Sequence, residues 1–244
     1  MLTSCSSDNP VSPNSTSIAP AYHASVQSLN GDFFSVCGAG AHDLYALGPA
    51  IMHYDGKNWN TMEPPSNQSG DFRQVAGLAD GSLLVAGGSS AYLRSEDAWV
   101  DISDPDHYAY ELWGNAPDDI YKLGFEDLRH FDGNAWTTVD VPGGTQNLYA
   151  ISGRSNGEVV ISGRLGRLIR YDGSTWSSAQ IDSNVTYQSL AVTESGRVFG
   201  STYREVYEIT GSTHHVVLRT VVEGPILCAV GELLFVSGHL CYGD

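Results

Sequence analysis

The chain has 244 residues, and its 28 acidic and 12 basic side chains give a formal net charge of −16. A negative field of this strength repels phosphate backbones and argues against nucleic-acid binding. Gly (27), Tyr (13) and Trp (5) are abundant while charged residues make up only 16%, which favours short strands and tight turns over long surface helices.

The amino-terminal segment resembles an exported, lipid-anchored protein. Leu2-Thr3-Ser4-Cys5 matches a bacterial lipobox, and this resemblance implies lipidation of Cys5 after signal cleavage. Residues 6–20 are rich in Ser, Asn and Pro, which is typical of a disordered tether. No later run is apolar for the ~18 residues that span a bilayer, so a membrane link would run through lipid. We expect residues 1–20 to be a lipobox remnant and tether at the bacterial cell envelope, periplasmic or at the cell surface; an arbitrary start followed by a floppy end is the alternative.

A repeated phrase dominates the remaining chain. Tryptophans recur at intervals of about 40 residues, at Trp59, Trp99, Trp136 and Trp176. The first, third and fourth close an Asp-Gly-x-x-Trp phrase that begins at Asp55, Asp132 and Asp172. Asp-Gly between apolar runs is a strong hairpin signal, because both residues tolerate a positive φ. We therefore interpret the repeated Asp, Gly and Trp as structural residues.

Each repeat reads as four short strands. The third copy predicts them at residues 110–113, 120–123, 128–131 and 136–141, with the first strand ending in Gly114. A four-stranded unit repeated at this period predicts the blades of an all-β β-propeller.

Six units are counted, beginning near residues 33, 71, 109, 146, 187 and 225. The last supplies only three strands, at 226–230, 233–236 and 240–242. Because residues 22–29 (YHASVQSL) also read as a strand, we expect this N-terminal strand to complete the last blade and close the ring. The sequence thus predicts one six-bladed β-propeller with four-stranded blades over residues 21–244.

The repeat resembles known propeller families. Residues 113–136, from Trp113-Gly114 to Asp132-Gly133 and Trp136, are similar to a repeat of bacterial secreted and lipoprotein β-propellers. Gly87-Gly88 with Tyr92 and Trp99 is distantly kelch-like, and residues 172–176 are distantly similar to the Asp-box of sialidases, although Asp and Gly are adjacent here. These resemblances imply a propeller and carry over no catalytic residue.

A binding face is predicted where residues break the repeat. The connections between blades and those between second and third strands meet on one face, at the mouth of the central channel. Aromatic and charged residues placed there include His107, Tyr108, Phe125 and Tyr187. Stacking aromatics and arginines suit glycans or carboxylates. The candidate ligand-binding residues are Arg73, Glu111, Tyr149, Arg164, Tyr203, Arg204 and His239; a chance scatter of exposed polar residues is the alternative.

Metal and cysteine chemistry is left open. Asp101, Asp104 and Asp106 form the densest acidic cluster, and their carboxylates would suit Ca²⁺, although the spacing is not that of an EF-hand; a solvated loop is the alternative. No other cofactor is expected. Cys37, Cys228 and Cys241 are buried small side chains or a disulfide pair plus one free thiol.

These features predict a surface-tethered, non-catalytic binding or scaffold propeller that recognises a protein or glycan and acts as a monomer. The alternative is a carbohydrate-active enzyme, either a glycoside hydrolase or a polysaccharide lyase, on the same scaffold. A buried Glu or His with a strongly perturbed pKa at the channel mouth would favour the enzyme.

Overall fold

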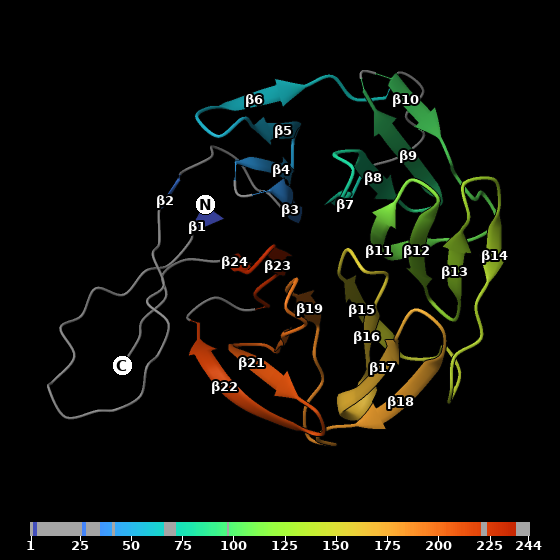
Figure 1. Cartoon of the computed structure of the whole chain (residues 1–244), viewed down its shortest axis with the longest axis vertical. Coiled ribbons are helices and arrows are strands. Elements are labelled where there is room, and N and C mark those ends of the chain that lie inside the picture. Colours follow the sequence, from blue (N-terminus) through green and yellow to red (C-terminus); the bar gives the residue numbers. More distant parts are fainter. Residues whose placement is uncertain are drawn as a thin grey trace, which may run out of the picture.

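The structure, a computed structural model, is a ring of β-sheets that each turn one edge strand toward a common axis (Figure 1). It describes Leu2–Thr3, Val26–Gln27 and residues 35–40, 42–65, 72–96, 98–220 and 224–237. Apart from one 3₁₀ turn, η1 (Arg164–Gly166), every element within these ranges is a β-strand. No helix in the described part of the chain is long and apolar enough to cross a membrane.

Five complete blades are each one continuous stretch of chain folded into four antiparallel strands, with the first strand at the axis. The first blade contains β3 (Ser35–Gly40), β4 (Asp43–Leu47), β5 (Ile51–Tyr54) and β6 (Trp59–Met62). The second contains β7 (Gln74–Gly77), β8 (Leu83–Gly87), β9 (Ser90–Ser95) and β10 (Ala98–Asp101). The third contains β11 (Ala109–Ala116), β12 (Asp119–Gly124), β13 (Leu128–Phe131) and β14 (Trp136–Thr138). The fourth contains β15 (Leu148–Gly153), β16 (Val159–Gly163), β17 (Arg167–Tyr171) and β18 (Trp176–Gln180). The fifth contains β19 (Ser189–Val192), β20 (Val198–Ser201), β21 (Glu205–Thr210) and β22 (Thr213–Arg219). The predicted four-stranded repeat is confirmed in all five.

The prediction of six blades is wrong: among the described residues five blades are complete, and the predicted composite blade is a hairpin with two very short added segments. A hairpin of β23 (Leu227–Val230) and β24 (Leu233–Ser237) lies between β19 and β3. Two segments of two residues each extend this hairpin into a sheet. β1 (Leu2–Thr3) pairs with β24, and β2 (Val26–Gln27) pairs with β1. Each of these pairings joins two residues to two. β1 and β2 therefore form fewer hydrogen bonds with their neighbours than the outer strands of the five complete blades do.

The predicted closure is therefore corrected in its details. Of the predicted closing strand the structure describes Val26–Gln27, and β1 separates these two residues from the hairpin. Leu2–Thr3 belongs to the segment predicted to be a lipobox remnant. The third strand predicted at residues 240–242 lies outside the described residues.

The Asp-Gly phrase forms the turns between third and fourth strands, as predicted. Asp172 accepts hydrogen bonds from the backbone N–H groups of Ser174 (2.9 Å) and Thr175 (2.8 Å), and Asp55 and Asp132 bind their turns in the same way. The next residue has a positive φ, +91° at Gly173. The backbone hydrogen bonds from Thr175 and Ser174 and the Ser174 hydroxyl lower the pKa of Asp172 to about 2. The carboxylates of these aspartates therefore serve to stabilise the turns.

The hydrophobic core is divided into layers that lie between neighbouring blades. One layer packs Leu78 and Leu84 of the second blade against Leu112 and Ile120 of the third, and further clusters fill the other contacts around the ring. The repeated tryptophans bridge the same contacts. The indole of Trp136 in the third blade donates to the carbonyl of Ile102, which follows the second blade, at 2.7 Å. The indole of Trp99 donates to the carbonyl of Glu63 in the preceding connection at 3.2 Å.

Gly114 marks a point where two blades approach closely, and it supports a testable prediction. A Cβ there would lie 2.6 Å from Cδ2 of Leu78 and 3.2 Å from Cγ1 of Ile120, both fully buried. We expect Gly114→Ala to lower the unfolding free energy by about 1–3 kcal/mol through overpacking, as measured by urea unfolding. Leu78→Val should cost less in the Gly114→Ala background than in the wild type; strictly additive effects would contradict this contact.

Candidate binding site

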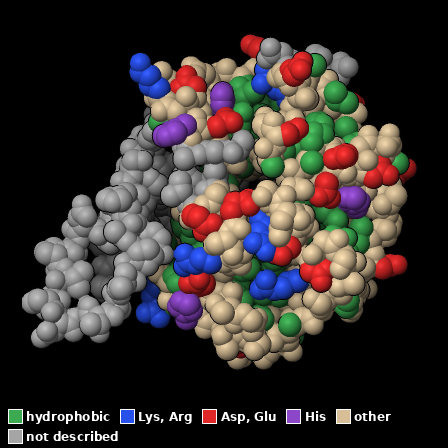
Figure 2. Space-filling view, viewed as in Figure 1, with side chains coloured by type: hydrophobic (Ala, Val, Ile, Leu, Met, Phe, Trp, Pro, Cys, Tyr) green, Lys and Arg blue, Asp and Glu red, His purple; other side chains and the backbone are tan. Residues whose placement is uncertain are grey.

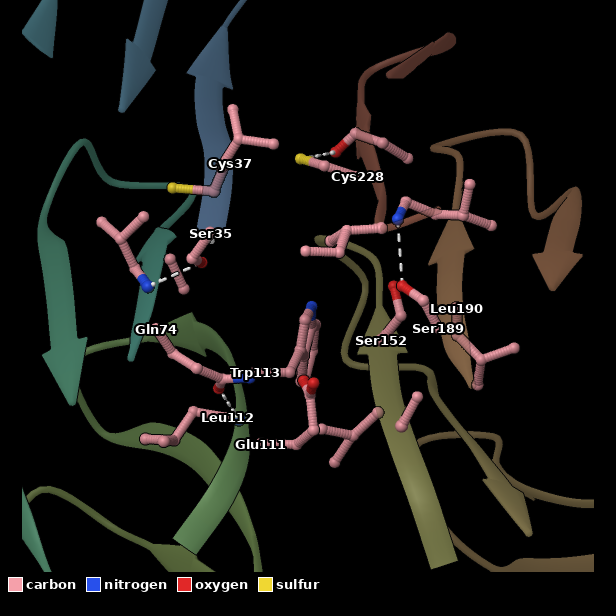
Figure 3. A pocket seen from close by; sticks show the side chains of 18 of the residues that line it. Ser35, Cys37, Gln74, Glu111, Leu112, Trp113, Ser152, Ser189, Leu190 and Cys228 are labelled. Atoms are coloured by element: carbon pink, nitrogen blue, oxygen red, sulfur yellow. Dashed lines mark hydrogen bonds between the residues drawn. The ribbon is translucent and has the colours of Figure 1, made fainter. Parts of the chain in front are cut away.

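The ring axis holds a cavity of about 200 Å³ (Figure 3). Its wall is formed by the innermost strands of the five blades together with β23 and the residues that flank them. The polar side chains in this wall are Ser35, Gln74, Glu111, Ser152, Gln188 and Ser189. The cavity therefore combines hydroxyl, amide and carboxyl groups with the apolar inner edges of the blades.

Most of these neutral polar groups bind one blade to the next. The backbone N–H of Val75 donates to Oγ of Ser35 at 3.1 Å, and that of Leu227 donates to Oγ of Ser189 at 3.0 Å. The N–H of Leu112 donates in the same way to Oε1 of Gln74. Backbone N–H groups that the ring geometry would otherwise leave without a strand partner are thus satisfied by side chains.

Glu111 is the one charged residue among the described residues of this wall. It is the third residue of β11, and its carboxyl group points into the cavity (Figure 3). Burial raises the pKa of Glu111 to about 7, against a hydrogen bond to the Gln74 side chain that lowers it. Trp113, two residues along the same strand, lines the same cavity because alternate residues of a strand share a face. The channel thus contains one acid that titrates near neutral pH beside an aromatic ring.

A group of exposed aromatic and aliphatic side chains lies at the end of the channel nearer Glu111. Tyr108 and Phe125 are 64% and 82% exposed, and Leu165 and Tyr203 are 48% and 54% exposed. Tyr149, at the start of β15, is 36% exposed. Tyr149 belongs to the first strand of the fourth blade, and the other four come from connections between blades or between second and third strands, in the third, fourth and fifth blades. We call these five residues the aromatic arc.

The strand order places the arc on one face, because every arc residue lies at the end of a blade where the first strand begins and the second strand ends. Further contacts hold the individual connections. The Tyr108 ring lies close enough to Gly88 that a Cβ there would be 3.4 Å from it. The N–H of Leu165 donates to the Thr186 hydroxyl at 3.2 Å. The Arg204 guanidinium lies over the Tyr203 ring, 5.4 Å from its centroid. Leu165 has φ +58°, an uncommon conformation for a residue with a side chain.

A buried ion cluster holds the arc's Tyr108 connection against the third blade. Lys122, only 3% exposed, places its Nζ 2.7 Å from Oδ2 of Asp104 and 3.1 Å from the carbonyl of His107. Arg129 Nε lies 3.3 Å from the same Asp104 oxygen. His107 Nδ1 is in turn 2.8 Å from Oδ2 of Asp127, in the connection that also carries Phe125. These contacts tie both connections to one support.

The opposite mouth of the channel is organised by contacts among its own residues. The carboxylate of Glu194 accepts from the Ser155 hydroxyl at 2.6 Å, and that of Glu232 accepts from the Ser195 hydroxyl at 2.7 Å. Arg154 pairs with Glu158 at 2.5 Å. Figure 2 shows one face of the ring, on which Lys, Arg, Asp and Glu side chains are interspersed around the centre. The net negative charge therefore does not form one continuous acidic patch on that face.

The structure brings some of the predicted ligand-binding residues together. Arg164, Arg204, Tyr149 and Tyr203 lie exposed on the face of the arc. Glu111 lies within the channel, and Arg73 is exposed directly before β7. His239 and Cys5 lie outside the described residues. Tyr187, expected on this face, is instead fully buried, and its hydroxyl contacts Nδ1 of His214 at 2.5 Å.

The aspartates considered for Ca²⁺ do not converge. Asp104 is occupied by Lys122 and Arg129, Asp101 accepts the N–H of Ser103 at 2.9 Å, and Asp106 is exposed. Over the described ranges no three His, Cys, Asp or Glu side chains form a group that could hold a metal ion.

The cysteines that the structure describes are free thiols. Cys37 and Cys228 both line the channel. Burial raises the pKa of each thiol, to about 12 for Cys228, so both stay neutral. Cys241 lies outside the described residues, and the pairing left open by the sequence is not formed between Cys37 and Cys228.

Comparison with known proteins identifies the architecture. No protein-family model matches the chain. A segment of 86 residues, 34% of the chain, is 31% identical to "Immune protein Tsi7" of Pseudomonas aeruginosa, and it spans 28% of that relative's length. Virginiamycin B lyase from Staphylococcus aureus superposes with a TM-score of 0.66 at 10% identity over 85% of this chain and 77% of the lyase. YCF48 bound to D1 peptide superposes with a TM-score of 0.57 at 14% identity, covering 81% and 72% of the two chains. Membership in the secreted Asp-Gly repeat family stays a prediction, while the fold is shown: the chain is an all-β β-propeller with four-stranded blades.

Proposed function

We propose that this propeller is a binding protein that recognises a protein partner through the aromatic arc. The observation that carries the proposal is the presence of five large, solvent-exposed side chains on one face of three consecutive blades. Single exposed hydrophobic residues are ordinary, whereas a group rimmed by polar residues is typical of an interaction site. Tyr and Arg, which occur here together, are enriched among the residues that dominate binding energy.

One structural neighbour and the sequence relative support a binding role. YCF48 carries a bound peptide on the same fold, and the matched segment of Tsi7 belongs to a protein named for an immune function. A protective role exerted by binding a partner would suit an exposed, preorganised face. The ion cluster around Asp104 supports preorganisation, because it holds Tyr108 in place before any partner arrives.

A paired cross-linking and affinity experiment tests the proposal. A photoreactive residue in place of Phe125 should cross-link a specific protein in cells, whereas one in place of Val217, 42% exposed on the outer strand β22, should not. With the captured partner purified, we expect Phe125→Ser with Tyr203→Ser to weaken its binding at least ~10-fold. Val217→Ser is the matched control. An equal loss of affinity in the Phe125→Ser, Tyr203→Ser double variant and in the Val217→Ser control would contradict the proposal. Binding of a glycan in place of a protein would contradict it as well.

One observation favours a second candidate, a carbohydrate-active enzyme. Glu111, with its pKa raised to about 7, suits a general acid at neutral pH. Glycoside hydrolysis generally uses two carboxyl groups about 5–10 Å apart, and among the described residues no second one lines the cavity. Turnover of neutral or anionic oligosaccharides that Glu111→Gln abolishes would establish this enzyme in place of the binding protein.

Export and lipid attachment at Cys5 remain part of the proposal. Cleavage before Cys5 would remove Leu2–Thr3 and with it the pairing of β1 to β24. The mass of the mature protein distinguishes the two arrangements: a diacylated or triacylated chain that begins at Cys5 supports anchoring, and an unmodified chain that retains Leu2 contradicts it.

A further inference from the structure

We propose that the channel receives a lysine or arginine side chain of the protein partner and pairs it with Glu111. The inference rests on the proposed function, because the arc would dock the partner at the channel mouth while one basic side chain enters the axis. It is carried by four features of the cavity: its single charged residue, the adjacent aromatic ring, the prior use of its neutral polar groups, and its position beside the arc.

The innermost strands present a ring of equivalent positions, of which Glu111 is the one with a charged side chain. In the other complete blades this position is held by Ser35, Gln74, Ala150 and Ser189, and directly before β23 it is held by Ile226. Three of these accept a backbone N–H from the next blade. Within the described part of the chain, the side chain of Glu111 is instead hydrogen-bonded to Gln74 of the preceding blade. A carboxyl group that is not used to bind the following blade is available for a ligand.

The surroundings of Glu111 suit an organic cation. No Lys, Arg or His is among the described residues that line the cavity. The strands packed against β11 contribute Gln74 from β7 and Ser152 from β15, and the cavity's two thiols stay neutral. Tyr110, the titratable neighbour in sequence, donates its hydroxyl to the carbonyl of Leu148 at 2.5 Å. An entering ammonium or guanidinium would therefore meet one carboxylate and no competing charge.

The lining of the site favours an organic cation over a metal ion. The Trp113 ring stands beside the Glu111 carboxyl group in the cavity (Figure 3), while it also packs against Gly153 and stacks on Tyr121. It therefore offers an apolar wall for the stem of a long basic side chain, whose guanidinium or ammonium satisfies a single carboxylate. Ca²⁺ would need six to eight oxygen ligands, which one carboxylate does not supply. The cavity of about 200 Å³ accommodates one long side chain.

Charge and position identify the occupant as part of a protein partner. The chain's net charge of −16 attracts basic surfaces over a distance and raises association rates. Glu111 is the third residue of β11 and Tyr108 immediately precedes that strand. The acid therefore lies just below the arc, within reach of a side chain projecting from a docked surface.

The test uses small cations and short peptides as probes. The indole N–H resonance of Trp113, assigned with Trp113→Phe, is followed by NMR during titration. We expect n-butylguanidinium to shift it saturably with a Kd on the order of 1–10 mM, as suits a ligand of so few atoms, while n-butanol does not. Glu111→Gln should weaken binding at least ~10-fold. Lowering the pH from about 8 to about 6 should weaken binding to the wild type and leave the variant unchanged.

Peptides separate the possible sources of the cation. Acetyl-Leu-Arg-Leu-amide should bind more tightly than n-butylguanidinium and lose its advantage in Phe125→Ser with Tyr203→Ser, and the citrulline peptide should not bind. No shift by n-butylguanidinium, unchanged binding in Glu111→Gln, or competition by Ca²⁺ would overturn the proposal. Binding of the small cation without the peptide would overturn the assignment to a protein side chain. Partner capture at Phe125 remains a separate result, so the binding function can hold when this inference fails.

Discussion

Asp104→Ala is expected to lower the unfolding free energy by about 3–5 kcal/mol, because it leaves the buried ammonium of Lys122 without its counterion. The side chains of Lys122 and Asp104 are 4% and 12% exposed, and their charged atoms lie 2.7 Å apart. Burial alone would raise the pKa of Asp104, but the hydrogen bond and charge of Lys122 and the charge of Arg129 hold that pKa below its usual value. Urea unfolding at neutral pH measures the loss.

A matched control and a double variant make this prediction specific. Asp106→Ala removes an exposed carboxylate from the same connection and should change the unfolding free energy by less than ~0.5 kcal/mol. Lys122→Met in the Asp104→Ala background should recover part of the loss, since it removes the uncompensated buried charge. Equal effects of Asp104→Ala and Asp106→Ala, or no recovery in the double variant, would show that the pair does not support the third blade.

The same pair gives Asp104→Ala a pH signature. A carboxyl group whose folded-state pKa is depressed contributes stability that is present above its unfolded pKa and is lost as the pH falls through the folded value. The wild type should therefore lose its advantage over Asp104→Ala on acidification below about pH 4. An advantage that persists at low pH would indicate that Asp104 acts through packing alone.

The local structure of the blades is predictable from sequence because its signals are local. Asp-Gly turns, alternating apolar residues and the spacing of Trp59, Trp99 and Trp136 locate each strand to within a few residues. Closure of the ring is not local. Whether β24 pairs with residues 22–29, with Leu2–Thr3 or with residues beyond 237 depends on contacts between chain ends, and no turn residue encodes that choice. The prediction of a sixth blade, completed by the N-terminal strand, is wrong for this reason.

The candidate site also combines features that local sequence predicts with features that depend on distant contacts. Exposure at the end of a blade follows from position in the repeat, so Tyr149, Tyr203 and Arg204 are expected at the surface, where they lie. Burial depends on which blade lies opposite, which is why Tyr187 is expected at the surface but lies in the core. The burial of Lys122 is not predictable from the sequence, because a lysine in a strand of alternating residues is expected to face solvent. Its burial depends on the ion pair with Asp104, which the sequence alone does not reveal.

The free energy of unfolding should fall as the pH rises from about 5 to about 8, and Glu111 should cause a separable part of that fall. In the unfolded chain a Glu has a pKa near 4.5, and in the native state burial raises the pKa of Glu111 to about 7. Between these values the native protein holds a proton that the unfolded chain has released. Its stabilising contribution is thus complete below the unfolded pKa and is lost as the pH rises through the folded one.

Glu111→Gln isolates this contribution, because the amide keeps the shape of the side chain and does not titrate. The variant should match the wild type near pH 4.5 and become more stable than it by up to about 3 kcal/mol at pH 8, the free energy that corresponds to the difference between the folded and unfolded pKa values. Glu126→Gln, at an exposed position in the third blade, controls for the change in net charge. A stability difference that stays constant with pH would contradict a raised pKa of Glu111 in the native state. Because an organic cation would bind the ionised form, saturating n-butylguanidinium should narrow the difference, by about 1.4 kcal/mol for a 10-fold difference in affinity, which joins the titration of this acid to its proposed ligand.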